Sequence, residues 1–122
     1  MSVLDIAGVL LHTTPDRHAA MRAFYLDALG LKTRSDRPGF TNFEFGTQRL
    51  TISLHDGVTG PSRDAHRIMI NFAVSDIEAA FERVVSYGAP VIRPPEPEAW
   101  GGLVATTADP DGNIIQLMEL PD

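Results

Sequence analysis

Two histidines, His12 and His55, lie at the ends of strand-like segments and could act as general bases or as metal ligands. Ser53 precedes His55 by two residues, so on a strand their side chains would point the same way, about 7 Å apart. This separation is too long for direct proton transfer and does not predict a serine nucleophile. The chain has no cysteine, which excludes a cysteine nucleophile, a thiolate metal site and a disulfide framework.

Other titratable side chains have ordinary structural explanations. His18 falls on the polar side of an expected helix, and His66 lies near two arginines in an expected linker, so both are predicted to be surface residues. Asp109 and Asp111 belong to an Asp-Pro-Asp-Gly turn, in which such carboxylates normally accept hydrogen bonds from backbone amides. Neither pair predicts a catalytic site.

The first half of the chain has the pattern of a strand, a helix and further strands. The apolar run 6–12 predicts a strand covered on both faces. Thr14 is expected to cap a helix whose apolar residues recur at three- and four-residue spacing, and Gly30 is expected to end it. Shorter strand-like segments follow at 41–45 and 50–55.

The second half repeats this order after a polar linker that contains Gly and Pro. An apolar strand is expected at 68–74, and Ser75 with Glu78 forms a capping box that would open a helix. Gly88 is expected to end this helix. Further strands follow, the last two joined by the Asp-Pro-Asp-Gly turn, and we expect them at 91–93, 103–107 and 113–119.

Aligning Gly30 with Gly88 superposes strand on strand and helix on helix at an offset of about 58 residues. The sequence therefore predicts an α+β fold in which two βαβββ modules, 4–56 and 67–120, are joined by a linker at 57–66. The 122 residues suffice for a single domain. Each module leaves one sheet face without cover of its own, so the two are expected to meet and form a cleft.

Charge and hydropathy exclude several classes of partner. The formal net charge of −6 argues against binding to nucleic acid or to an anionic membrane surface. No apolar run approaches the ~18 residues that a membrane span needs, and the N-terminus lacks the basic region of a signal peptide. We therefore expect a cytoplasmic protein with no nucleic-acid or membrane partner.

Several short motifs occur in order along the chain. They are Phe24-Tyr25 through Leu29-Gly30-Leu31, Val74-Ser75-Asp76-Ile77-Glu78, Tyr87-Gly88-Ala89, Trp100-Gly101 and Asp109-Pro110-Asp111-Gly112-Asn113. Over essentially its whole length the chain resembles the vicinal-oxygen-chelate (VOC) superfamily, the fold of glyoxalases, bleomycin-resistance proteins and extradiol dioxygenases. The resemblance implies that the two modules form a half-barrel cleft. It is specific for the fold and not for an activity.

In metal-bearing members of this superfamily, the first and fourth strands of both modules each supply one ligand to a divalent ion, usually His, Gln or Glu. The resemblance places these positions on Gly8 or Ala7, Ser53, Met69 and Gln116. Gln116 alone has a suitable side chain. We therefore expect no metal cofactor, which puts lyase, isomerase and dioxygenase chemistry in doubt because these reactions use the ion as a Lewis acid.

Strand alternation predicts further cleft residues, since residues two apart share a face. His12 is expected to share the face of the first-strand position, His55 that of Ser53, and Asn71 that of Met69. If the first and fourth strands are parallel neighbours, His12 and His55 lie at the same end of the cleft. This pair leaves a displaced metal site open, although no Asp or Glu on these faces supplies a third ligand.

Trp100, in a Pro- and Gly-rich loop, is expected either to border the cleft or to anchor its own loop. The interpretation we favour is a metal-independent small-molecule binder of the bleomycin-resistance type, commonly a homodimer. The alternatives are an enzyme with a nonstandard metal site or a histidine general base, and an interaction module with an empty cleft. The predicted ligand-binding residues are His12, Ser53, His55, Met69, Asn71, Trp100 and Gln116.

Overall fold

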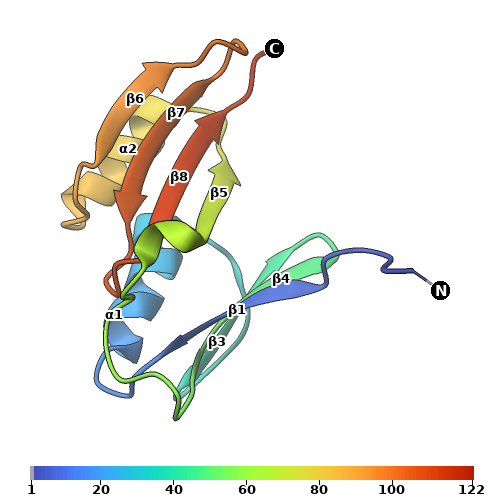
Figure 1. Cartoon of the computed structure of the whole chain (residues 1–122), viewed down its shortest axis with the longest axis vertical. Helices are drawn as coiled ribbons and strands as arrows, with labels where there is room; N and C mark the ends of the chain where they lie inside the picture. The colour runs from blue at the N-terminus through green and yellow to red at the C-terminus, as the bar shows by residue number, and fades with distance from the viewer. Residues whose placement is uncertain (1) are drawn as a thin grey trace. The chain divides into compact units, whose positions relative to one another are not determined.

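The computed structural model describes residues 2–122 and divides into two compact units, one ending at Gly60 and the other beginning at Pro61. Each unit contains a four-stranded mixed sheet and a helix that packs on it (Figure 1). Within the described residues, no helix is both long enough and apolar enough to cross a membrane.

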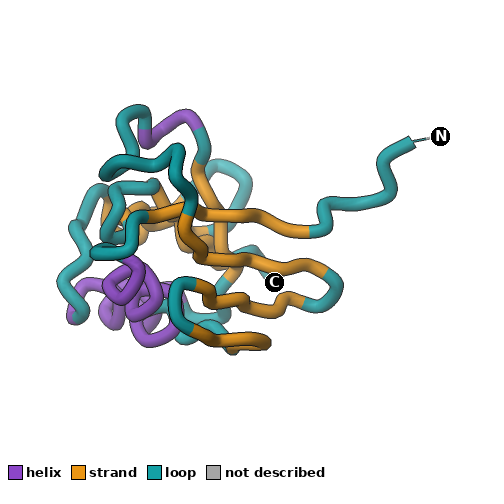
Figure 2. Tube along the Cα trace, turned by 90° about the horizontal axis from the view of Figure 1, so that it is seen from below, coloured by secondary structure: helices purple, strands orange, loops and turns teal. Residues whose placement is uncertain are grey.

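The first unit follows the order strand, helix and three strands. Its elements are β1 (Gly8–Thr13), α1 (His18–Ala23), a π-helical turn η1 (Phe24–Ala28), β2 (Thr33–Arg37), β3 (Phe40–Phe45) and β4 (Gln48–Leu54). The strand order in the sheet is β1-β4-β3-β2, with β1 parallel to β4 and the other neighbours antiparallel. Before β1 the chain runs as an extended loop (Figures 1 and 2).

The second unit repeats this plan. Its elements are a 3-10 turn η2 (Ala65–Arg67), β5 (Met69–Ala73), α2 (Ile77–Ser86), β6 (Arg93–Pro97), β7 (Leu103–Ala108) and β8 (Ile114–Glu119). The strand order β5-β8-β7-β6 is that of the first sheet, again with one parallel pair, β5 and β8. The predicted α+β class and the βαβββ repeat are therefore confirmed.

Both helices begin later than the sequence predicted. Thr14 does not cap α1, because its hydroxyl donates to Asp16 and its carbonyl closes a turn by accepting from the Arg17 and His18 amides. At α2 the cap is Asp76 instead of Ser75, and its carboxylate accepts from the Ala79 amide. Helix α1 therefore begins without a side-chain cap, whereas α2 is capped one residue later than expected.

The core of the first unit lies between α1, η1 and one side of the sheet. Met21 and Tyr25 are four residues apart and fully buried, as helical periodicity predicts. Phe43 and Ile52 reach them from β3 and β4 and are also fully buried. The rings of Tyr25 and Phe43 have centroids 6.4 Å apart. This packing assigns one side of the sheet to the core and leaves the other for polar residues.

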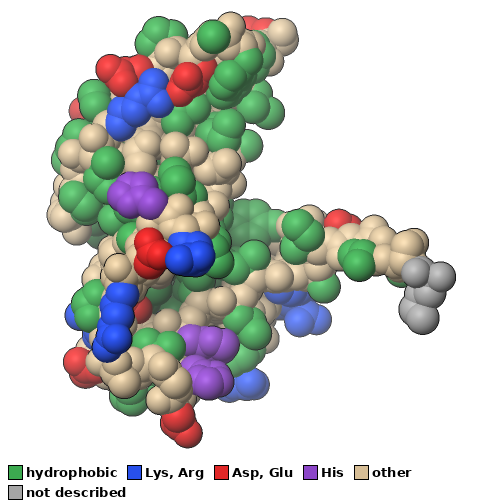
Figure 3. Space-filling view, viewed as in Figure 1, with side chains coloured by type: hydrophobic (Ala, Val, Ile, Leu, Met, Phe, Trp, Pro, Cys, Tyr) green, Lys and Arg blue, Asp and Glu red, His purple; other side chains and the backbone are tan. Residues whose placement is uncertain are grey.

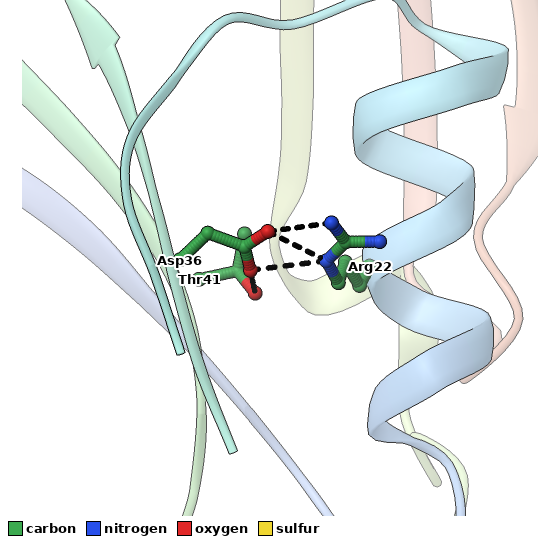
Figure 4. A network of polar contacts seen from close by, with 3 residues as sticks. All are labelled: Arg22, Asp36 and Thr41. Atoms are coloured by element: carbon green, nitrogen blue, oxygen red, sulfur yellow. Dashed lines mark hydrogen bonds and ion pairs between the residues drawn. The ribbon is translucent and has the colours of Figure 1, made fainter. Parts of the chain in front are cut away.

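A polar network ties α1 to the edge of the first sheet (Figure 4). Arg22 donates from both Nε and Nη2 to Asp36 on β2, and Thr41 on β3 donates to the same carboxylate. The hydrogen bonds from Arg22 hold the pKa of Asp36 below its usual value, and Thr41 acts in the same direction. The Asp36 carboxylate therefore points to the side of the sheet on which the helix packs.

His18 belongs to this helix side, and its predicted surface position is wrong. It lies four residues before Arg22 on the same side of the helix and is only 8% exposed. Its Nε2 is buried and has no hydrogen-bond partner among the described residues. His18 lies three and seven residues before the buried Met21 and Tyr25, so it belongs to the apolar stripe of the helix, and the prediction placed it on the wrong side. His66, in contrast, is exposed as predicted.

Candidate functional site

The register of the first sheet shows which side chains share a face, because residues opposite one another on neighbouring strands point to the same side. Ser53 on β4 pairs with His12 on β1 and with Phe40 on β3. Phe40 pairs in turn with Arg37 on β2. Ile52, which points to the other side, is buried in the core. His12, Ser53, Phe40 and Arg37 thus form a row across four strands, and we call this side the polar face.

His12 and His55 meet at one end of the row. Their ring centroids are 4.9 Å apart, and the ring planes are inclined by 43°. His55 directly follows β4 and lies two residues after Ser53, so it projects to the same side. Histidine side chains reach the surface in the space-filling view (Figure 3). The structure therefore brings together the two imidazoles that the sequence placed at one end of the face.

A backbone amide determines the hydrogen-bonding role of His55. Its Nδ1 accepts a hydrogen bond of 2.9 Å from the Gly57 N–H. An accepting nitrogen carries no proton, so the neutral ring holds its proton on Nε2 and offers a donor there. A metal ligand needs a free lone pair, and neither nitrogen of this tautomer provides one. His55 is thus arranged to donate to a ligand and not to chelate an ion.

Replacing Gly57 with proline is expected to release this tautomer, because proline has no N–H to donate. Gly57 does not have a positive φ, but a Cβ there would lie 3.1 Å from Nδ1 of His55, so the proline also crowds the imidazole. Imidazole ¹⁵N chemical shifts should report the Nε2–H form in the parent protein and a mixture of both tautomers in the variant. Gly60→Pro in the same loop is the control. An unchanged Nε2–H spectrum in Gly57→Pro would contradict the assignment.

Asn42 is a polar-face residue that the sequence analysis missed. It pairs with Thr51 on β4, its Nδ2 donates to the Thr51 hydroxyl at 2.6 Å, and it is only 8% exposed. Its Oδ1 is buried and has no partner among the described residues. Strand alternation could have predicted this position, because Asn42 lies between Thr41 and Phe43 on β3 and therefore points away from the core.

The second sheet carries a corresponding row. Asn71 pairs with Gln116, Gln116 with Thr106, and Thr106 with Arg93. Gln116 donates to the Thr106 hydroxyl over 3.4 Å, and Asn71 is exposed. Met69 lies on the same side, two residues before Asn71, and is 37% exposed. The structure therefore places three of the predicted site residues on one face of this sheet.

Trp100 lies in the turn before β7, where its ring lies against Gly102. A Cβ at Gly102 would overlap the ring and would also meet the Glu119 carbonyl at 2.7 Å. The ring remains 48% exposed. Trp100 thus packs on its own loop while presenting part of its surface.

The first-strand position suggested by the resemblance does not lie beside Ser53. Gly8 pairs with Arg49, and a Cβ added at Gly8 would lie 2.6 Å from the Arg49 carbonyl oxygen. Any side chain there would therefore displace the backbone. The first-strand neighbour of Ser53 is His12. Gly8 and Ser53 are therefore four residues apart in register along the parallel pair of β1 and β4.

The side chains at these positions do not fit the divalent ion of metal-bearing relatives. The parallel strand pairs bring His12 to Ser53 and Asn71 to Gln116, which together offer an imidazole, a hydroxyl and two amides. Zinc, iron and related ions are held mainly by imidazole, carboxylate and thiolate groups. Among residues 2–122, no three His, Cys, Asp or Glu side chains are grouped so that they could hold a metal. The donor set suits hydrogen bonding instead.

Comparison with known proteins agrees with this architecture. A glyoxalase-related enzyme from Fulvimarina pelagi is 22% identical, with 97% of this chain and 89% of that one covered and a TM-score of 0.76. A protein of unknown function from Agrobacterium tumefaciens str. C58 is 25% identical, with 98% and 97% covered and a TM-score of 0.76. A lactoylglutathione lyase from Agrobacterium tumefaciens is 22% identical, with 94% and 92% covered and a TM-score of 0.69.

No curated protein matches the chain. The family model described as "Glyoxalase/Bleomycin resistance protein/Dioxygenase superfamily" matches residues 10–117, a stretch that runs from β1 to β8. This match covers both βαβββ units and agrees with the fold of the solved structures. The chain therefore belongs to the glyoxalase/bleomycin resistance protein/dioxygenase superfamily.

Proposed function

We propose that the chain binds a small organic molecule on the polar face of the first sheet without using a metal ion. The observation that carries this proposal is the row of His12, Ser53 and Phe40, which sets an imidazole, a hydroxyl and an aromatic ring side by side. All three side chains are half-buried, so they are both positioned and accessible. Small-molecule sites combine apolar surface with a few polar groups in this way.

Two further residues support the proposal. His55 is arranged to donate from Nε2, because its other ring nitrogen accepts from Gly57. Asn42 has an unpartnered amide oxygen, and a buried group of this kind costs about 1–3 kcal/mol when it remains unpaired. A ligand that accepts from His55 and donates to Asn42 would satisfy both groups.

Histidine-based catalysis is the second candidate function, and the contact between His12 and His55 favours it. A histidine beside a hydrogen-bond donor can take a proton from a bound substrate. The chain would then be a glyoxalase-like lyase, isomerase or dioxygenase that uses His12 as its base. Loss of turnover in His12→Ala with retained ligand binding would separate this function from sequestration.

A thermal-shift screen tests the proposed function directly. With EDTA present, members of a small-molecule library should raise the melting temperature, by an amount that grows with ligand concentration. Mn²⁺, Ni²⁺, Zn²⁺ and Fe²⁺, each added alone, should leave it unchanged. Shifts caused by ligands should be lost in His12→Ala and retained in His66→Ala, the matched change at an exposed histidine.

The opposite pattern would overturn the proposal. If one equivalent of a metal ion bound each chain and raised the melting temperature, and if His12→Ala abolished this effect, the face would be a displaced metal site. A screen without any ligand-induced shift would instead favour an interaction module. The homodimer and the cytoplasmic location expected from the sequence stay part of the proposal.

A further inference from the structure

We infer that the ligand of the polar face is a small aromatic acid whose anionic group binds Arg37, an inference that rests on the proposed function. Arg37 ends the row that begins at His12. It is exposed, and it lies opposite Phe40 across the Pro38-Gly39 turn, where Gly39 has a φ of 74°. A tight turn therefore fixes the guanidinium-bearing residue next to the aromatic ring.

Contact with the Phe40 ring holds the Arg37 guanidinium in a position where it can bind an anion. Its Cζ lies 4.2 Å from the centroid of the Phe40 ring. A cation at this distance from an aromatic face is attracted to the ring, and this contact does not use up the guanidinium N–H donors. These N–H groups match the two oxygens of a carboxylate in a bidentate pair. Phe40 thus holds the cation without neutralising it.

The nearby carboxylates do not belong to this row. Asp36, the residue before Arg37, points to the helix side and binds Arg22. Glu44 is on the polar face but lies at the far end of β3, where it pairs in register with Arg49. Asp56 follows His55 in the exposed loop after β4. Among the described residues paired in the row itself, none is acidic.

The internal repeat provides a comparison within the same chain. Arg93 ends the polar row of the second sheet, opposite Thr106, although it is the first residue of β6 whereas Arg37 is the last residue of β2. The Arg93 guanidinium donates to Glu96 and to Glu98, both over 2.6 Å, so it is enclosed by two carboxylates. The hydrogen bonds that it donates to Glu96 and Glu98 raise the pKa of Arg93. Of these two arginines, Arg93 is paired with carboxylates and Arg37 packs on an aromatic ring, so Arg37 is the one that can receive an anionic ligand.

The other end of the row sets the size of the ligand. His12 and Arg37 are separated by three strand spacings, about 14 Å between backbones, and both side chains shorten the gap. A single aromatic ring with an acid group can therefore contact Arg37, pass over Phe40 and present an acceptor to Ser53 or to Nε2–H of His55. An aliphatic acid would lack an aromatic ring to contact that of Phe40, and we therefore expect it to bind more weakly.

Benzoate and benzamide are suitable probes, because they have the same shape and differ in charge. Titration of ¹⁵N-labelled protein should show benzoate shifting the amide signals of residues 37–40 and 53–55, with a Kd in the millimolar range expected for so small a ligand. Benzamide should bind at least about tenfold more weakly. Higher NaCl should weaken benzoate binding and leave benzamide binding unchanged.

Arg37→Gln should weaken benzoate binding about tenfold, since it removes a charge-assisted pair but keeps a side chain of similar length. Arg34→Gln makes the same charge change on β2 and should have no effect. Equal affinity for the two probes, or unchanged benzoate binding in Arg37→Gln, would overturn the inference. Neutral library compounds could still shift the amide signals of residues in the row, and His12→Ala could abolish those shifts. In that case the proposed function would hold and only the inference about an aromatic acid would fail.

Discussion

Replacing Phe43 with alanine is expected to lower the free energy of unfolding by about 3–5 kcal/mol. Phe43 is fully buried on the core side of β3, and its ring centroid lies 6.4 Å from that of Tyr25. Truncation leaves a cavity that the neighbouring side chains can fill only in part, so transfer free energy and dispersion contacts are both lost. Urea unfolding followed by circular dichroism measures the effect, and an unchanged m value shows that the two proteins can be compared.

Phe45→Ala is the matched control for this variant. Phe45 lies two residues further along β3, but it is 40% exposed. Its truncation creates no closed cavity, and the loss should stay below about 1 kcal/mol. Phe43 and Phe45 share one side of β3, so the pair compares a closed with an open position on the same face. Equal losses for the two phenylalanines would contradict the conclusion that Phe43 is enclosed by the core and Phe45 is not.

The sequence predicted most of the fold because its signals come from burial and from glycine. Gly30 and Gly88 end the helical segments with φ values of 72° and 94°, which other residues rarely adopt. Met21 and Tyr25 show the helical period of a buried stripe. Such features are local, and because they occur twice the repeat could be recognised from one chain.

Two strands show where burial signals were insufficient. β2, with the sequence Thr-Arg-Ser-Asp-Arg, was not predicted, because an edge strand exposed on much of its surface has no apolar alternation. β1 was predicted to be covered on both faces, yet it is also an edge strand, and Val9 and Leu10 are 40% and 61% exposed. An apolar run alone does not distinguish a central strand from an uncovered edge.

The candidate site was predicted in part for the same reason. Alternation correctly placed Ser53 and His55 on one side of β4, and the parallel pairing brought His12 to them. Arg37 and Phe40 were missed because they lie at a hairpin formed by the unpredicted β2. The hydrogen bond from Gly57 to His55 depends on the path of a loop and leaves no periodic signal. Side chains on predicted strands could be found, whereas those fixed by turns could not.

Asp109→Ala is expected to destabilise the chain by about 2–4 kcal/mol, since it removes the acceptor for several donors at once. The Asp109 carboxylate accepts from the backbone amides of Asp111 and Asn113 and from the Asn113 side chain, at 2.8 to 3.0 Å. Asp109 is only 4% exposed, so water cannot readily replace the lost acceptor. Thermal or urea unfolding of the variant measures the loss.

Asp109→Asn distinguishes the contribution of the backbone hydrogen bonds in the turn from the contribution of the negative charge at residue 109. Its amide oxygen can still accept from the backbone of Asp111 and Asn113, but its amino group faces the Asn113 side chain, which also donates. We expect this variant to lose about half as much stability as Asp109→Ala. If Asp109→Ala unfolded no more easily than the parent, the carboxylate would not support the turn between β7 and β8. Since β7 carries Thr106 and β8 carries Gln116, a weakened turn should also loosen the row on the second sheet.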